Sequence, residues 1–364
     1  MSERDLPIRS ELERIPPYNS GLTLAEVRAR YKVETISKLG SNENPLGSSQ
    51  KVTDCLASPG DLFRLYPDPQ GKALCEAIAI KFGVLPGQVV LGNGSEDLIG
   101  VICSAAVRDG DVVTTLYPSF PLHEDYAVLM GGKVERITVR PDLEIDFPAL
   151  LAAARRAPRM VMFSNPMNPV GSWLRRDEMR DIIDAVSEDT LLVIDEAYVE
   201  YAEGEDYASA LEDLKASSKN WIILRTFSKA YGLAGLRIGF AITGDRRLTD
   251  YLNRARTPFN TNAIAQAAAL AALGDGEHLR ETVDLAIRER ERVARELASR
   301  GYRIAPSRGN FIFFDCGGDA VKFSETLLGK GVITKPWKQE GFDTFVRVSL
   351  GLRSENDHFL ASLP

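Results

Sequence analysis

The apolar run Trp221-Ile222-Ile223-Leu224 passes through Arg225 and Thr226 into Phe227-Ser228-Lys229-Ala230-Tyr231-Gly232-Leu233-Ala234-Gly235-Leu236-Arg237-Ile238-Gly239. The run is short and continuous, which is typical of a strand covered on both faces. Lys229 therefore follows directly after a buried strand, where loss of water lowers a lysine pKa toward the range useful for a Schiff base. The neighbouring hydroxyls and Arg237, eight residues after the lysine, could hold a phosphate group.

Two other interpretations of this segment fit less well. A solvated lysine in a surface turn is common, but here Ser228, Lys229 and Arg237 crowd beside an apolar strand. The glycines follow the spacing G-x-x-G-x-x-x-G, which differs from the dinucleotide-binding pattern G-x-G-x-x-G. The spacing therefore disfavours a nucleotide-binding loop.

Strand and helix patterns alternate through the middle of the chain. Short apolar runs predict strands at Val89–Leu91, Val112–Leu116, Val134–Val139, Met160–Ser164, Leu191–Asp195, Trp221–Thr226 and Ile238–Ile242. Stretches between them predict helices at Lys72–Phe82, Ser95–Val107, Phe120–Met130, Phe147–Arg156 and Arg176–Val186. This alternation predicts an α/β fold whose large domain, residues 51–275, has a mostly parallel seven-stranded sheet between helices.

The C-terminal third has a different pattern. Residues 276–300 predict one long charged helix with an apolar stripe at helical spacing. Later segments predict a helix near Val321–Leu328 and strands at Arg303–Ala305, Phe311–Asp315, Val332–Thr334 and Phe345–Leu350. We expect a smaller α+β domain made of residues 276–364 together with residues 1–50, which carry one short helix and wrap onto it.

Composition and charge exclude several classes of protein. The 364 residues include 44 Lys and Arg against 51 Asp and Glu, a net charge of −7 that argues against a nucleic-acid partner. The four cysteines lack C-x-x-C spacing and the three histidines are far apart in sequence, so no metal site or Ser-His-Asp triad is expected. The charged N-terminus has no apolar signal segment, and the longest uncharged run, residues 257–274, is typical of a packed helix rather than a membrane span. We expect a cytoplasmic protein.

Polar side chains follow two more of the predicted strands. Asp195 ends the run Leu191–Asp195 at the edge where α/β folds place ligands, and Tyr198 comes three residues later. Two Asn-Pro pairs within residues 165–169 make a rigid turn that aims the side chain of Asn168. Taken singly, a helix cap and an ordinary loop also explain these motifs.

A fourth motif resembles an anion site. The predicted strand at Val89–Leu91 leads through Gly92-Asn93-Gly94 into a helix that starts at Ser95. The exposed N–H groups and the dipole of such a helix start attract anions. An ordinary helix start capped by Ser95 is the alternative.

Together the four motifs resemble the class I and II pyridoxal-phosphate aminotransferases of fold type I. The resemblance covers almost the whole chain and includes Ser41-Asn42-Glu43-Asn44-Pro45-Leu46-Gly47, Tyr66-Pro67-Asp68-Pro69, Tyr117-Pro118-Ser119-Phe120, Phe259–Asn262 and Phe345–Gly351. Within that class the chain is most similar to the histidinol-phosphate aminotransferases. The resemblance implies pyridoxal 5'-phosphate as cofactor and amino transfer between histidinol phosphate and 2-oxoglutarate in histidine biosynthesis.

The resemblance also implies roles for individual residues. Lys229 would form the Schiff base with the cofactor and move a proton, Asp195 would pair with the ring nitrogen, and Tyr198 would bond the phenolic oxygen. The remaining cofactor contacts would come from Tyr117 on the ring, Asn168 on the phenolic oxygen, and Gly94, Ser95, Glu96, Thr226, Ser228 and Arg237 around the phosphate. Tyr66 would reach the phosphate in a partner subunit, which implies a homodimer with shared active sites.

Substrate contacts are implied for Arg347, as a clamp on the α-carboxylate, and for Lys335 and Asn44. The family usually has an arginine where this chain has Lys335, which keeps the charge but lacks the planar fork, and Trp337 is also unexpected. The amino donor therefore stays open, with an aromatic amino acid aminotransferase and a phosphothreonine-type decarboxylase as alternatives. A nicotinamide-dependent dehydrogenase and a non-catalytic binding protein are the alternatives from other classes.

Overall fold

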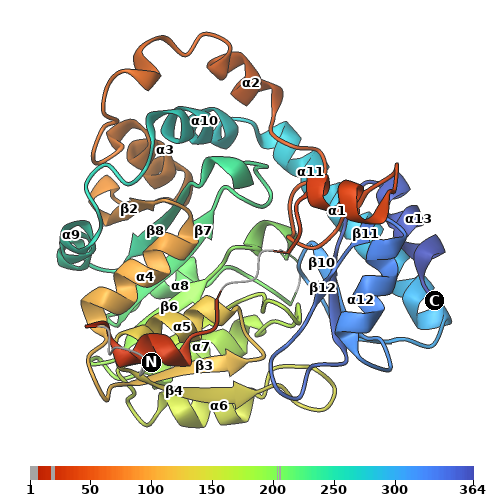
Figure 1. Cartoon of the computed structure of the whole chain (residues 1–364). Helices are drawn as coiled ribbons and strands as arrows, with labels where there is room; N and C mark the ends of the chain where they lie inside the picture. Colours follow the sequence, from red (N-terminus) through yellow and green to blue (C-terminus); the bar gives the residue numbers. More distant parts are fainter. Residues whose placement is uncertain (1–6, 18–20, 203, 205) are drawn as a thin grey trace.

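The computed structural model describes residues 7–17, 21–202, 204 and 206–364 (Figure 1). Its largest sheet has seven strands in the order β2-β8-β7-β6-β5-β3-β4. The strands are β2 (Val89–Gly92), β3 (Val112–Tyr117), β4 (Lys133–Thr138), β5 (Met160–Ser164), β6 (Leu191–Asp195), β7 (Asn220–Thr226) and β8 (Gly239–Thr243). Strand β8 runs antiparallel to both neighbours, and the other neighbouring pairs are parallel. The predicted α/β class with a mostly parallel seven-stranded sheet is confirmed.

Successive residues of a strand point to opposite sides of the sheet. Because the central strands carry apolar residues on both sides, both faces of the sheet are apolar, and helices cover each of them. In β2, Val89 and Leu91 belong to one apolar core and Val90 belongs to the other. The first core also receives side chains from α3 (Lys72–Phe82), α6 (Phe147–Ala154), α7 (Arg176–Ala185), α8 (Leu211–Lys215) and α10 (Ala263–Leu273). The second receives them from α4 (Ser95–Ala106), α5 (Pro121–Leu129) and α9 (Arg246–Ala255).

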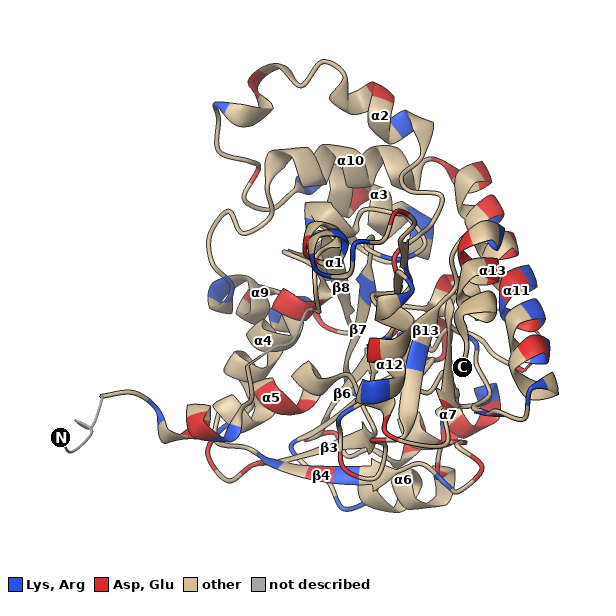
Figure 2. Cartoon of the chain, turned by 45° about the vertical axis from the view of Figure 1, so that its right-hand side comes forward, with Lys and Arg blue, Asp and Glu red and all other residues tan. Residues whose placement is uncertain are grey.

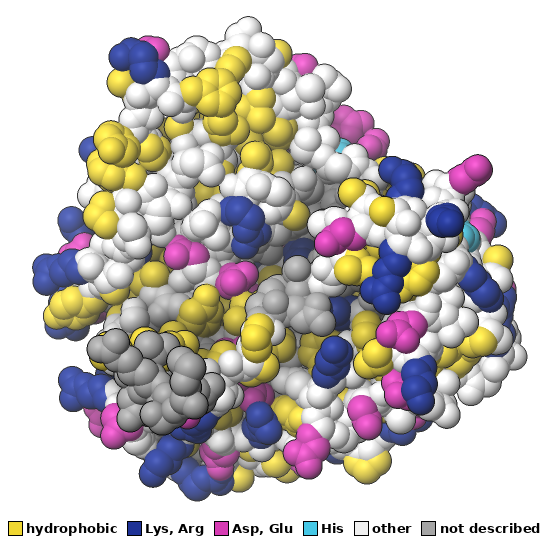
Figure 3. Space-filling view, in the orientation of Figure 1, with side chains coloured by type: hydrophobic (Ala, Val, Ile, Leu, Met, Phe, Trp, Pro, Cys, Tyr) yellow, Lys and Arg dark blue, Asp and Glu magenta, His cyan; other side chains and the backbone are white. Residues whose placement is uncertain are grey.

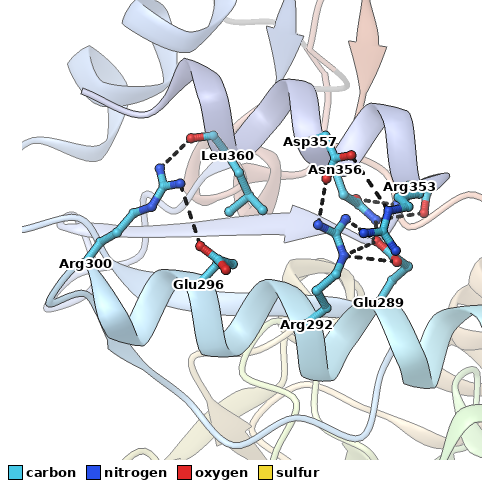
Figure 4. Close-up of polar contacts among 9 residues, drawn as sticks. Glu289, Arg292, Glu296, Arg300, Arg353, Asn356, Asp357 and Leu360 are labelled. Carbon is cyan, nitrogen blue, oxygen red and sulfur yellow. Dashed lines mark hydrogen bonds and ion pairs between the residues drawn. The ribbon is translucent and has the colours of Figure 1, made fainter.

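A second, antiparallel sheet has the strand order β12-β13-β10-β9. Its strands are β9 (Arg303–Ile304), β10 (Phe311–Asp315), β12 (Lys335–Pro336) and β13 (Phe345–Ser349). A separate apolar core joins this sheet to α11 (Gly276–Ser299), α12 (Ala320–Gly329) and α13 (Arg353–Ser362). Charged residues of both signs recur along α11 (Figure 2). Arg292 of α11 pairs with Asp357 of α13 at 2.6 Å, and Asn356 Nδ2 donates to Glu289 Oε2 at 2.7 Å (Figure 4).

The described residues among the first fifty, 7–17 and 21–50, contact both parts of the molecule. Helix α1 (Leu24–Tyr31) contacts α12, and β1 (Ser37–Lys38) pairs in parallel with β11 (Val332–Ile333). The 3-10 helix Ser10–Arg14 instead contacts α5, on one face of the large sheet. This segment therefore does not pack only on the C-terminal elements, and the domain boundaries given above stay a prediction.

The remaining elements are short. Helix α2 (Gln50–Leu56) packs on α10, and further 3-10 helices lie at Gly60–Phe63, Pro86–Gln88, Val199–Tyr201 and Ala234–Leu236. No helix within the described ranges is long and apolar enough to cross a membrane.

Candidate active site

The predicted site residues of the large sheet meet because three neighbouring parallel strands end at one edge. In the order β5-β6-β7, Ser164 lies opposite Asp195, and Asp195 lies opposite Leu224, two residues before Thr226. The segments that follow these strands therefore leave the sheet side by side. From the second sheet, Arg347 of β13 reaches the same place, and its Nη1 donates to Asn168 Oδ1 at 2.6 Å. The site thus lies between the two sheets.

Lys229 has an enclosed amino group at the centre of this site. Its Nζ donates to the main-chain oxygen of Ser41 at 2.9 Å and lies 5.8 Å from the centroid of the Tyr198 ring. Burial, followed by the positive charge of Arg347, lowers the pKa of Lys229 to about 7. A substantial share of Lys229 is therefore neutral near pH 7, and the neutral amine is the form that attacks a carbonyl.

Asp195 is a buried carboxylate held by two donors. Only 5% of the residue is exposed. Its Oδ1 accepts from the main-chain N–H of Ala197 at 3.0 Å, and its Oδ2 lies 3.2 Å from Nε2 of His123, a fully buried residue of α5. Sequence reasoning missed His123, because one histidine inside a helix carries no motif. Among the described residues, no cluster of His, Cys, Asp and Glu is arranged to hold a metal ion.

An anion cradle forms where α4 begins. Gly94 has φ +88°, and a Cβ at that position would lie 2.5 Å from Arg237 Nη2, so a side chain there would displace the guanidinium. Arg237 Nη1 donates to Ser228 Oγ at 3.4 Å, and its Nη2 lies 3.8 Å from a carboxylate oxygen of Glu96. The main-chain N–H of Ser228 donates to Thr226 Oγ1 at 3.1 Å. The anion cradle is therefore formed by the first turn of α4, the guanidinium of Arg237 and the hydroxyls of Thr226 and Ser228.

Tyr198 accepts two side-chain hydrogen bonds. Asn42 Nδ2 donates to its hydroxyl oxygen at 2.9 Å, and Asn168 Nδ2 donates at 3.3 Å. Arg347 donates through Nη1 to Asn168 and through Nη2 to the main-chain oxygen of Gly40 at 2.8 Å. Asn42 was not predicted as a site residue, although it lies in one of the quoted motifs.

Lys335 lies directly opposite Arg347 in the pairing of β12 with β13. Burial, followed by the charges of Arg347 and Lys338, lowers the pKa of Lys335 to about 8. Trp337 is buried, and its ring centroid lies 5.9 Å from the guanidinium carbon of Arg347. Two cations and an indole thus line the side of the site formed by the second sheet.

Asn44 uses its side-chain amide within the chain. Its Nδ2 donates to the main-chain oxygen of Ala230 at 3.2 Å and to Thr282 Oγ1 at 3.1 Å, while its Oδ1 accepts from the N–H of Leu46 at 3.0 Å. These bonds fasten the segment to the turn after Lys229 and to α11. The geometry therefore favours a structural role for Asn44, and its contact with substrate stays a prediction.

The two predicted aromatic contacts differ in exposure. Tyr66 is 82% exposed and stacks on Phe259 with 4.8 Å between ring centroids. Tyr117 is buried; its hydroxyl donates to the main-chain oxygen of Glu340 at 2.9 Å, and Arg136 lies 4.7 Å from its ring centroid. The exposure of Tyr66 leaves it able to meet a second subunit.

Comparisons with known proteins agree over nearly the whole chain. The family model described as aminotransferase class I and II matches residues 34–363. Histidinol-phosphate aminotransferase 3 of Rhizobium meliloti is 61% identical, covering 98% of this chain and 96% of its own length. Histidinol-phosphate aminotransferase 1 of Mesorhizobium japonicum is 59% identical, covering 100% and 99%. A crystal structure of histidinol-phosphate aminotransferase from Sinorhizobium meliloti in complex with pyridoxal-5'-phosphate has a TM-score of 0.88 at 28% identity, covering 100% of this chain and 98% of that one.

Proposed function

Because the chain belongs to the class I and II aminotransferase family, we propose that it transfers the amino group of L-histidinol phosphate to 2-oxoglutarate. The chain is an aminotransferase that uses pyridoxal 5'-phosphate, and the dehydrogenase alternative is wrong. The donor assignment rests on the two similar relatives and on the cations of the site. We also propose a cytoplasmic location, because both substrates belong to amino-acid metabolism.

The residues of the site fit the cofactor. When bound, pyridoxal 5'-phosphate supplies an aldehyde for amines and a ring that accepts electrons from the substrate. We assign its aldehyde to Lys229, its phosphate to the cradle formed by α4 and Arg237, and its ring nitrogen to Asp195. The bond between His123 and Asp195 keeps that carboxylate in place. Lys229 Nζ, partly neutral near pH 7, is positioned to take and return the proton at the substrate Cα.

The proposed donor requires the site to hold two kinds of anion in turn. Histidinol phosphate has a phosphate ester where amino acids have the α-carboxylate, whereas glutamate and 2-oxoglutarate have carboxylates. The planar fork of Arg347 matches the two oxygens of a carboxylate. A phosphate has a third oxygen and a larger negative charge than a carboxylate. We propose that Lys335 contacts this third oxygen and balances the additional charge. Arg347 would therefore hold phosphate in one half-reaction and carboxylate in the other.

The observation that carries this donor is the register of β12 with β13, which sets Lys335 opposite Arg347. A single-turnover screen tests it: the purified holoenzyme is mixed with histidinol phosphate, phenylalanine or phosphothreonine, and the absorbance of the cofactor is followed. We expect the highest kcat/KM for histidinol phosphate. Equal efficiency with phenylalanine would favour the aromatic aminotransferase, with Trp337 as a stacking wall. Release of CO2 from phosphothreonine would favour the decarboxylase.

We further propose that the protein is a homodimer in which Tyr66 completes the partner's site. Large apolar side chains near Tyr66 are exposed, at 74% for Phe63, 53% for Leu65 and 40% for Phe259. Figure 3 shows hydrophobic side chains gathered on the part of this face where Figure 1 places α2 and α3. A patch of this kind is typical of an interface between subunits. Sedimentation equilibrium should give twice the mass of the chain, and a monomer at micromolar concentration would refute the proposal.

A further inference from the structure

Five residues of the site form a closed ring of contacts. Arg347 donates to Asn168, Asn168 donates to Tyr198, and Asn42 donates to Tyr198. Ser349 Oγ then donates to Asn42 Oδ1 at 2.8 Å, and Ser349 lies two residues after Arg347 on the same strand, β13. Residues two apart on a strand share a face, so the strand itself closes the ring.

Asn42 is held firmly in this ring. The residue is fully buried, and its φ of +55° lies in the left-handed region that asparagine tolerates better than most residues. Its main-chain N–H donates to Ser349 Oγ at 2.7 Å, and its main-chain oxygen accepts from Asn310 Nδ2 at 3.1 Å. Main chain and side chain together fix the direction in which the Asn42 amide points.

The hydrogen-bond roles around Tyr198 follow from the donors. Arg347 can only donate, so the Asn168 atom that faces it is oxygen and the Asn168 nitrogen faces Tyr198. Asn42 presents its nitrogen to Tyr198 and its oxygen to the Ser349 hydroxyl. A tyrosine hydroxyl has two acceptor sites and one hydrogen. With both acceptor sites taken by amides, the hydrogen of Tyr198 is directed to a third group.

We propose that Asn42 is a positioning residue that directs the Tyr198 proton onto the phenolic oxygen of the cofactor. The inference rests on the cofactor placement in the proposed function. Donation from Asn42 polarises the hydroxyl and makes Tyr198 the stronger donor. A hydrogen bond donated to the phenolic oxygen stabilises negative charge there. It would therefore lower the pKa of the Schiff base on Lys229, which is the chromophore pKa that the absorbance reports. Asn42 would therefore set that pKa without touching the cofactor.

The test is a pH titration of the holoenzyme absorbance without substrate, using a double-mutant cycle. Asn42→Gly keeps the left-handed backbone and removes the amide. We expect it to raise the chromophore pKa by roughly 0.5 to 1 unit, the shift that one ordinary hydrogen bond produces. In the Tyr198→Phe background the same change should produce no further shift, because the hydroxyl through which Asn42 acts is gone.

Asn310→Ala is the matched control. Asn310 donates to the main chain of Asn42 and is also buried, yet no bond joins its side chain to Tyr198 among the hydrogen bonds described. It should lower the melting temperature of the apoenzyme and leave the chromophore pKa unchanged. Ser349→Ala, which frees the Asn42 amide, is the second variant and should raise the pKa by a smaller amount than Asn42→Gly.

Three results would overturn the proposal. An equal shift with and without the Tyr198→Phe substitution would mean that Asn42 acts through general disturbance of the site. No shift in either Asn42→Gly or Ser349→Ala would mean that Asn42 has no influence on the cofactor. A fall in the pKa would mean that Asn42 accepts the Tyr198 proton instead of donating. Because no substrate is present, a wrong amino donor leaves this test readable, and a protein without any chromophore would refute the cofactor placement instead.

Discussion

Lys335 provides a pH-dependent test of the proposed donor. Because burial and Arg347 lower its pKa to about 8, the ammonium keeps its proton below that pH and loses it above. The phosphate ester has its second pKa near 6, so it stays fully charged across this window. The KM for histidinol phosphate should therefore rise as pH passes through about 8.

The magnitude follows from the contact that is lost. A hydrogen bond between charged groups contributes about 1.5–3 kcal/mol, which corresponds to roughly 10- to 150-fold in affinity. Lys335→Met should raise the KM for histidinol phosphate by that factor at pH 7. The change should spare phenylalanine, whose carboxylate has two oxygens that the fork of Arg347 already satisfies. Lys335→Arg should keep the low KM to higher pH, since arginine does not lose its proton.

The assay measures single-turnover rates from pH 6.5 to 9.5 for the wild type and both variants. The ratio of wild type to Lys335→Arg at each pH cancels the titration of Lys229 and of the donor amine. The reasoning fails if that ratio is flat with pH. It also fails if Lys335→Met lowers the efficiency of both donors equally, because Lys335 would then be a structural residue.

Three further predictions concern the rest of the site. Borohydride reduction of the holoenzyme should fix the cofactor on Lys229 alone in peptide mapping, and label on another lysine would contradict the assignment. Asp195→Asn should keep the fold, as measured by circular dichroism. It should lower the transamination rate by roughly 100- to 5000-fold, since breaking the buried ion pair with the ring nitrogen costs about 3–5 kcal/mol. Near-normal turnover would exclude Asp195 as the partner of the ring nitrogen. Mixing Lys229→Ala with Tyr66→Phe subunits should restore activity, because each hybrid dimer keeps one complete site. Failure to recover, with subunit exchange demonstrated, would place Tyr66 in its own subunit's site.

The fold was predictable wherever a local pattern determines it. The runs ending at Ser164, Asp195 and Thr226 are continuous and apolar, because both faces of the parallel sheet are covered. Helices α9 and α13 were not predicted; α13 is rich in polar residues and buries only one face of a short helix. Strand β12 was not predicted either, because two residues have no periodicity and are a strand only through pairing with β13.

The site was predictable where its residues directly follow strands. Asp195 ends β6, and Lys229 lies three residues after the end of β7 at Thr226, so the sequence alone predicts their position at the sheet edge. His123 and Asn42 reach the site from a helix and from an extended segment, and only the tertiary arrangement brings them to Asp195 and Tyr198. Asn44 shows the opposite case. Its place in a motif predicted a contact with substrate, but its side-chain amide donates hydrogen bonds to Ala230 and Thr282 of the same chain.

The N-terminal segment determines more of the site than its lack of secondary structure suggests. Pairing of β1 with β11 fixes where the chain goes next, and three successive residues then bond to the site: Gly40 to Arg347, Ser41 to Lys229 and Asn42 to Tyr198. Two of these contacts use main-chain oxygen, which no side-chain substitution removes. A change that shifts the pairing of β1 should therefore disturb all three residues together, whereas Asn42→Gly should leave the main-chain contacts of Arg347 and Lys229 in place and remove only the direct bond to Tyr198. Lys229, Arg347 and Tyr198 are thus coupled through the backbone of one short segment.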